Sequence, residues 1–203
     1  MGKGAALHLE ILVEEPSAEA ALGKLLPKIL GETPSFRIHV FSGKKDLLRK
    51  LPQRLRGYKK WLPPEYRILI LVDQDRENCH QLKQRLNRVI QEAGLMYRLQ
   101  ILTRIAIEEL EAWFLGDFEA IRSAFPRIPA NLDRKAAYRD PDGIRGSWET
   151  LERLLQRVGY YRNGMPKIEA ARVIASHMDT TRNRSHSFQV FLRGVRELAN
   201  SEA

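Results

Sequence analysis

Residues 66–77, YRILILVDQDRE, carry the strongest structural signal in the chain. Residues 68–72 are all apolar, which is typical of a strand in a parallel α/β sheet with both faces covered. This run is far shorter than the roughly 20 residues that a membrane helix needs, so no membrane partner is expected. Asp73 and Asp75 follow the strand directly. Their spacing places both side chains on one side of an extended chain, where one metal ion can contact both.

Outward from this segment, predicted strands alternate with predicted helices. Besides 66–72, strands are expected at 7–13, 36–41 and 97–102, and helical patterns follow each of them, the last two at 76–93 and 107–125. Short connections in this order favour a parallel sheet with helices on its faces. The predicted fold class is therefore α/β, with a mainly parallel four-stranded sheet flanked by helices and a helical C-terminal subdomain.

The chain changes character after residue 125. Residues 126–147 are rich in Pro, Gly, Asp and Arg and show no apolar period, so a long loop is expected there. Three helical patterns follow, at 148–158, 168–177 and 187–199. The expected organisation is an α/β core over 1–125, followed by a loop and a helical C-terminal subdomain over 126–203.

The charge of the chain points to a polyanionic partner. The 34 Lys and Arg residues exceed the 25 Asp and Glu residues, which gives a net charge of +9. Between residues 43 and 67, nine basic residues stand against two acidic ones. Such a stripe favours nucleic acid as partner, although a solvated basic helix face explains the pattern equally well. The expected phosphate contacts from this stripe are Lys44, Lys45, Arg49 and Arg56.

The remaining composition suggests a cytoplasmic protein. Cys79 is the single cysteine, so an internal disulfide is impossible and a reducing compartment is the simplest expectation. The N-terminal residues run into acids after one short apolar segment and lack a small-residue cleavage site, unlike a secretory signal.

Carboxylates are concentrated where the predicted strands end. In open parallel sheets, ligands bind at the carboxyl ends of the strands. Acids follow three of the four: Glu14 and Glu15, then Asp73, Asp75 and Glu77, then Glu108, Glu109 and Glu111. An acidic pocket within a basic surface suits Mg²⁺ or Mn²⁺ acting on a phosphodiester, because hard cations prefer oxygen ligands. The alternative is that these acids only complement helix dipoles.

Two of these segments resemble a known domain. LHLEILVEEPSAEAAL at 7–22 and ILILVDQDREN at 68–78 are similar to the TOPRIM domain of topoisomerases, DnaG-type primases and OLD-family nucleases. KKDLLRKLPQRLRGY, RIAIEELEAWFLGD and KIEAARVIASHMD further resemble a small uncharacterised bacterial family of TOPRIM-like proteins related to OLD-type nucleases. The resemblance implies that Glu14, Asp73 and Asp75 act together on Mg²⁺. Glu15 stands where TOPRIM proteins usually have Gly, so Glu15 remains an alternative to Glu14.

The resemblance implies a metal-dependent nuclease, with Glu14, Asp73 and Asp75 as catalytic and metal-binding residues. Glu109 is a further candidate ligand, and Glu15, Glu77 and Glu111 are weaker ones. OLD-like nucleases use a downstream lysine, and Lys167 is a candidate cation for a DNA or RNA phosphate. The alternative function is a non-catalytic TOPRIM-like module that binds nucleic acid or a protein partner, for instance beside an ATPase in phage defence.

Overall fold

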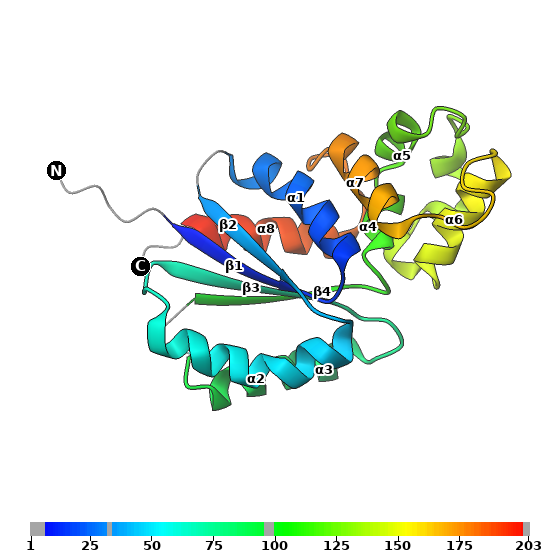
Figure 1. Ribbon diagram of the computed structural model, residues 1–203. Helices are drawn as coiled ribbons and strands as arrows, with labels where there is room; N and C mark the ends of the chain where they lie inside the picture. The colour runs from blue at the N-terminus through cyan, green and yellow to red at the C-terminus, as the bar shows by residue number, and fades with distance from the viewer. Residues whose placement is uncertain (1–6, 32–33, 96–99, 201–203) are drawn as a thin grey trace.

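The protein has one four-stranded sheet, in which all strand pairs are parallel (Figure 1). The computed structural model describes residues 7–31, 34–95 and 100–200. The strand order is β2-β1-β3-β4, so β1 and β3 are neighbours. The predicted α/β class with a parallel four-stranded sheet is confirmed. The strands are β1 (His8–Val13), β2 (Ser35–Val40), β3 (Tyr66–Asp73) and β4 (Gln100–Ala106).

Helices cover both faces of the sheet, which explains the uninterrupted apolar run in β3. Helices α1 (Pro16–Leu30) and α8 (His186–Asn200) pack on one face, while α2 (Lys44–Trp61) and α3 (Cys79–Glu92) cover the other (Figure 1). Side chains of successive β1 residues point to opposite faces: Ile11 joins the core under α1 and α8, and Leu12 joins the core under α2 and α3. None of the described helices is both long and apolar enough to cross a membrane.

The boundaries predicted for the fourth strand were wrong. The apolar residues favoured a strand at 97–102, but β4 runs from Gln100 to Ala106, and residues 97–99 lie outside the described residues. Thr103 and Arg104 interrupt the apolar pattern and concealed this part of the strand. Their polar side chains find partners in the tertiary structure: the Thr103 hydroxyl accepts a hydrogen bond from Lys83 Nζ, and Arg104 Nε donates to Val190 O at 3.2 Å.

The single helix expected over 107–125 is also wrong, because the chain forms α4 (Glu111–Leu115) and α5 (Phe118–Ala124) instead. Asp117 begins the second helix, since its Oδ1 accepts a hydrogen bond from the backbone N–H of Ala120 at 3.1 Å. The chain around Asn183 passes so close to Gly116 that any Cβ there would collide with the Asn183 side chain. The Asn183 side chain also donates to Trp113 O at 2.7 Å and the Arg184 N–H to Gly116 O at 2.9 Å, so a segment far along the chain binds backbone carbonyls at the break.

The C-terminal helices pack onto the sheet and α1 and share their hydrophobic core. Helices α6 (Ser147–Arg157) and α7 (Lys167–His177) lie beyond the carboxyl ends of the strands, with α7 beside α1 (Figure 1). Leu151, Ile174 and Phe191 belong to the same hydrophobic cluster as the α1 residues. The segment expected as a loop, 126–147, contains three short 3₁₀ helices, at Leu132–Arg134, Ala136–Tyr138 and Pro141–Gly143.

Candidate active site

Glu14 is bound directly to the end of β3. It follows β1, its side chain is buried, and its Oε1 accepts a hydrogen bond from the backbone N–H of Asp73 at 2.7 Å. Burial raises the pKa of the Glu14 carboxyl to about 7, while the bond from Asp73 and the charge of Lys44 act in the opposite direction. The pairing of β1 with β3 thus brings two of the predicted site residues into contact.

Asp73 and Glu111 place two more carboxyl groups near Glu14, at the end of β3. Burial raises the pKa of Asp73 well above its usual value, and the charges of Glu111, Glu14 and Glu15 add to this effect. Glu111, the first residue of α4, is 1% exposed, and burial raises its pKa to about 7. In the part of the chain that the structure describes, neither Glu111 carboxylate oxygen has a hydrogen bond to another residue. Four residues, which we call the inner carboxylates, thus gather here: Glu14, Glu15, Asp73 and Glu111.

Lys167 supplies a positive charge to the inner carboxylates. It is the first residue of α7, and its Nζ lies 2.6 Å from Glu15 Oε1 and 3.6 Å from Glu111 Oε1. Burial lowers the pKa of the ammonium group, but the attraction of Glu111 and Glu15 outweighs burial and raises the pKa above its usual value. The ammonium also lies 5.3 Å from the centre of the Trp148 ring. Lys167 is therefore a charged member of the acidic site.

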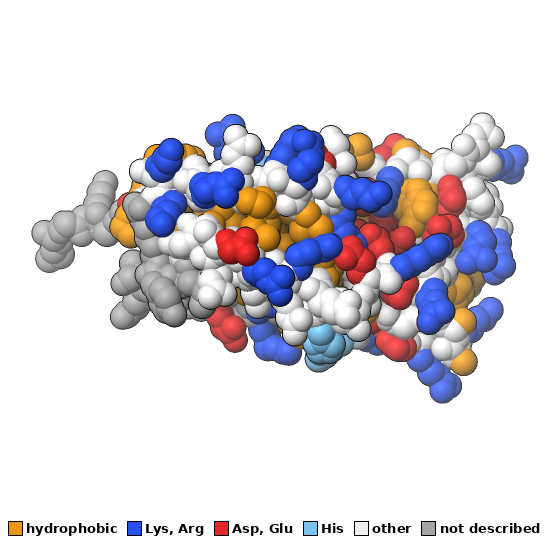
Figure 2. Space-filling model, turned by 90° about the horizontal axis from the view of Figure 1, so that it is seen from below, with side chains coloured by type: hydrophobic (Ala, Val, Ile, Leu, Met, Phe, Trp, Pro, Cys, Tyr) orange, Lys and Arg blue, Asp and Glu red, His pale blue; other side chains and the backbone are white. Residues whose placement is uncertain are grey.

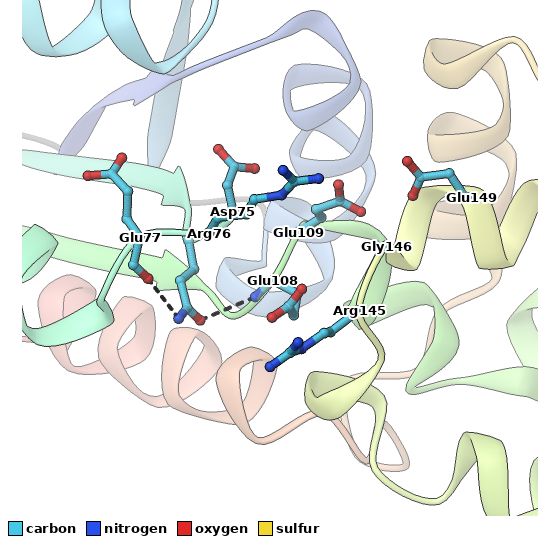
Figure 3. A pocket seen from close by; sticks show the side chains of 9 residues that line it. Asp75, Arg76, Glu77, Glu108, Glu109, Arg145, Gly146 and Glu149 are labelled. Carbon is cyan, nitrogen blue, oxygen red and sulfur yellow. Dashed lines mark hydrogen bonds between the residues drawn. The ribbon is translucent and has the colours of Figure 1, made fainter.

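A second acidic group lines an open pocket of about 970 Å³ beside the inner carboxylates (Figure 3). Two of its residues have left-handed backbone conformations, Asp75 with φ 52° and Glu108 with φ 59°. Such conformations are uncommon outside glycine and occur often at functional sites. The backbone N–H of Asp75 donates to Glu108 O at 2.7 Å, which joins the turns after β3 and β4. The pocket is lined by Gln74, Asp75, Arg76, Glu77, Glu108, Glu109, Arg145, Gly146 and Glu149.

Lys44 neutralises part of this pocket. It begins α2, and its Nζ lies 2.6 Å from Asp75 Oδ2 and 3.4 Å from Glu77 Oε1. Lys44 was predicted to contact a nucleic-acid phosphate; in the structure its charge is already paired with two acids. Glu109, in the predicted carboxylate group after β4, is bound by a backbone group instead of a lysine. Its Oε2 accepts a hydrogen bond from the backbone N–H of Trp148 at 2.8 Å. Burial raises the pKa of Glu109.

The other predicted phosphate contacts lie outside the pocket, along α2. Lys45, Arg49 and Arg56 are exposed, and Arg49 Nη2 pairs with Asp46 Oδ1 at 2.6 Å. Figure 2, which views the side of α2 and α3, shows Lys and Arg side chains scattered over this face and a group of Asp and Glu side chains to the right of its centre. The structure therefore separates the predicted basic residues into Lys44 and Lys167 at the acids and a basic helix surface leading away from them.

Sequence reasoning missed several residues of this site. Gln74 joins two turns, because its Nε2 donates to Glu77 O at 3.0 Å and its Oε1 accepts from the Glu108 N–H at 3.4 Å. Gln74 lies between the two aspartates, so its position in the motif was the available signal. Arg145, Trp148 and Glu149 come from the start of α6 and the segment before it, and no local pattern marked them.

The donor set fits a hard divalent cation, although its members are not arranged around one. Among the described residues, no three or more His, Cys, Asp or Glu side chains are grouped closely enough to hold an ion. Lys44 pairs instead with Asp75 and Glu77, and Lys167 with Glu15 and, at 3.6 Å, with Glu111, whose oxygens accept no hydrogen bond among the described residues. Carboxylate oxygens are the ligands that Mg²⁺ and Mn²⁺ prefer, and a buried carboxylate without hydrogen bonds is costly unless a cation compensates it.

The fold and the site define a class: an α/β protein with an acidic pocket at the carboxyl edge of a parallel sheet. A family described as Domain of unknown function (DUF4276) matches residues 13–196. The chain therefore belongs to this family. The matched region contains all four inner carboxylates and the acids of the pocket. Neither the comparison with curated proteins nor the comparison with solved structures gave a match.

Proposed function

We propose that this protein is a TOPRIM-type nuclease, which hydrolyses nucleic-acid phosphodiesters with the help of Mg²⁺ or Mn²⁺. The observation that carries the proposal is the convergence of the inner carboxylates from the ends of β1 and β3 and the start of α4, in a chain with a net charge of +9. The contact between Glu14 and Asp73 at the end of β3, with Asp75 two residues further on, also agrees with the TOPRIM resemblance of the sequence.

Glu14, Asp73 and Asp75 would hold the metal, with Glu109 as a further ligand and Glu15, Glu77 and Glu111 as weaker candidates. The raised pKa of Asp73 supports a site that binds a cation, and Lys167, 3.6 Å from the buried Glu111 carboxylate, compensates part of the negative charge in the metal-free protein. A bound divalent ion supplies positive charge to a phosphodiester and lowers the pKa of its bound water.

The protein's own cations would orient the substrate. Arg76 and Arg145 line the acidic pocket from two different segments, and guanidinium groups suit phosphate oxygens. Lys167 and Lys44 already compensate the acids, so they would limit repulsion between the carboxylates and an approaching phosphate. The exposed basic surface of α2, which includes Lys45 and Arg56, would attract the DNA or RNA backbone.

A non-catalytic module is the second candidate function. Lys167 and Lys44 form ion pairs with the acids, and no metal-holding group of three side chains occurs among the described residues. Such an arrangement suits a protein that binds nucleic acid or a partner, for instance an ATPase in phage defence, without chemistry of its own.

Crystals of the protein soaked with Mn²⁺ test the choice between the two functions. For the nuclease, we expect anomalous density between Glu14 and Asp73 and cleavage of labelled DNA or RNA that EDTA stops. Intact nucleic acid and the absence of anomalous density, with the protein folded, would favour the non-catalytic module.

A further inference from the structure

The C-terminal end of α2 carries an exposed tryptophan. Trp61 is 60% exposed, and Trp61 and Ile168 are the two large hydrophobic side chains that stand out as exposed among the described residues. A tryptophan in water at the end of a helix contributes little to the core, since most of its apolar surface stays hydrated. Large exposed aromatic side chains are common where a protein contacts a partner.

The Trp61 indole packs against a buried ring, that of Tyr58. The Tyr58 ring lies 5.6 Å from it, centre to centre, at an angle of 72°. Tyr58 itself is 1% exposed, and its hydroxyl donates a 2.8 Å hydrogen bond to Glu10 Oε2. Packing against a fixed ring restricts the indole, so a ligand that stacks on it loses less side-chain entropy on binding.

Positive charges surround this aromatic pair. The Arg54 guanidinium carbon lies 5.8 Å from the centre of the Tyr58 ring. The same end of α2 borders a surface hollow of about 600 Å³, lined by Arg56, Lys59, Lys60, Glu92 and Ala93. An aromatic side chain beside a basic groove is the arrangement with which proteins bind single-stranded nucleic acid: bases stack on the ring and phosphates contact the cations.

We propose that Trp61 stacks on an unpaired base of single-stranded nucleic acid, while Arg56 and Lys60 contact the neighbouring phosphates. The proposal rests on the proposed function in taking nucleic acid as the partner, and it adds a preference for single strands. A duplex is disfavoured because its bases are already stacked inside the helix and unstacking them costs free energy.

Helix α2 would connect this stacking site to the acidic pocket. Its first residue, Lys44, contacts Asp75, and Trp61 is its last residue, about 26 Å away at 1.5 Å per residue. With about 3.4 Å per stacked nucleotide, this distance corresponds to about eight nucleotides. Lys45, Arg49 and Arg56 lie exposed between the two ends, about 120–160° round the helix from Trp61, so a strand held at Trp61 would cross α2 to reach these basic side chains and the pocket.

Binding of a fluorescein-labelled 12-nucleotide single strand, measured by anisotropy in EDTA, tests the proposal without any cleavage. We expect Trp61→Ala to weaken binding about tenfold, and Trp61→Phe to retain most of the affinity because the ring can still stack. Ile168→Ala, which removes the other exposed large hydrophobic side chain, is the matched control and should bind like wild type. The affinity for a duplex of the same sequence should not change in Trp61→Ala.

Salt dependence separates stacking from charge. Trp61→Ala should leave the slope of log K against log salt unchanged, whereas Arg56→Ala/Lys60→Ala should reduce it by about 1.4, at about 0.7 per lost phosphate contact on a single strand. Wild-type affinity in a folded Trp61→Ala variant, or an equal loss for single strand and duplex, would overturn the proposal. Absence of cleavage with a clear Trp61 effect on binding would overturn the nuclease function alone. DNA and RNA versions of the strand show which sugar is preferred.

Discussion

The backbone N–H of Asp73 donates a 2.7 Å hydrogen bond to Glu14 Oε1, so a carboxylate proposed to bind metal is also a structural link between two neighbouring strands. Glu14 is buried, and its partner lies at the last residue of β3. The two roles of Glu14 make opposite demands on a substitution, because the hydrogen bond needs an oxygen and metal binding needs a charge.

Glu14→Gln and Glu14→Ala should therefore differ in stability but not in activity. The glutamine keeps an acceptor for the Asp73 N–H and removes a buried charge, so the free energy of unfolding should be equal to that of wild type or higher. The alanine leaves that N–H without its partner and should lose about 1–3 kcal/mol. Urea denaturation measures both variants, and both should lack Mg²⁺-dependent cleavage. Equal stability of the two variants would contradict the structural link.

Asp75→Asn should abolish Mg²⁺-dependent cleavage and leave the protein folded. Removing one negative charge weakens metal binding; it relieves repulsion among clustered acids but also removes the half-exposed ion pair with Lys44, so the stability of the metal-free protein should change by about 1 kcal/mol or less. Asparagine tolerates the left-handed conformation at this position, where φ is 52°. Cleavage of a labelled oligonucleotide and thermal unfolding are the measurements. Glu197→Gln, an exposed substitution on α8, is the control, and activity of Asp75→Asn at the wild-type rate would rule out a catalytic Asp75.

Lys83 should make the stability of the protein depend on pH above neutrality. Burial lowers its pKa to about 8, and the nearby charge of Arg104 acts in the same direction. Because an exposed lysine has a pKa of about 10.4, the unfolded chain binds more protons than the folded protein between these two values. The free energy of unfolding contributed by Lys83 should therefore rise as the pH rises from about 8 to about 10.4.

Urea denaturation of wild type and Lys83→Met at pH 7.5 and 9.5 measures this effect. The free energy of unfolding of wild type should rise relative to that of Lys83→Met between pH 7.5 and pH 9.5. The substitution also removes the hydrogen bond to Thr103 O, which lowers stability at both pH values. The test is therefore how the stability difference between the two proteins changes with pH. Lys24→Met, at an exposed position on α1, should show no such shift. A constant difference for Lys83→Met would contradict the prediction.

The basic surface of α2 should bind the nucleic-acid backbone without sequence preference. Lys45→Ala/Arg49→Ala/Arg56→Ala should weaken binding by a similar factor on any sequence and lower the salt slope by about 0.7 to 0.9 per lost contact. Arg49 is paired with Asp46, so its share should be the smallest of the three. Thermal stability should hardly change, because the three side chains are exposed.

Filter binding at several salt concentrations measures the slope. Lys24→Ala/Arg193→Ala/Arg196→Ala, which removes the same charge from exposed positions on α1 and α8, is the matched control and should keep the wild-type slope. An unchanged slope in the α2 variant would mean that this surface is only a solvated helix face.

Local patterns were sufficient for the sheet and for the acids at its edge. The apolar run before Asp73 indicated a covered strand, and the alternation of strands with helices indicated a parallel sheet, because both signals depend on residues close together in the chain. Parallel strands present their carboxyl ends at one edge, so the positions of Glu14 and Asp73 relative to the strands already placed both acids at that edge, whereas their contact depends on the neighbouring positions of β1 and β3.

Contacts between distant segments decided the rest. Lys167 reaches Glu15 from 152 residues further along the chain, and Asn183 and Arg184 bind backbone carbonyls at the break between α4 and α5. The buried position of Glu111, without a hydrogen bond, likewise follows from packing, since an acid at the start of a helix is ordinarily solvated. Burial, pairing and charge compensation are properties of the packed molecule, because they depend on which groups exclude water from one another and not on their spacing in the chain.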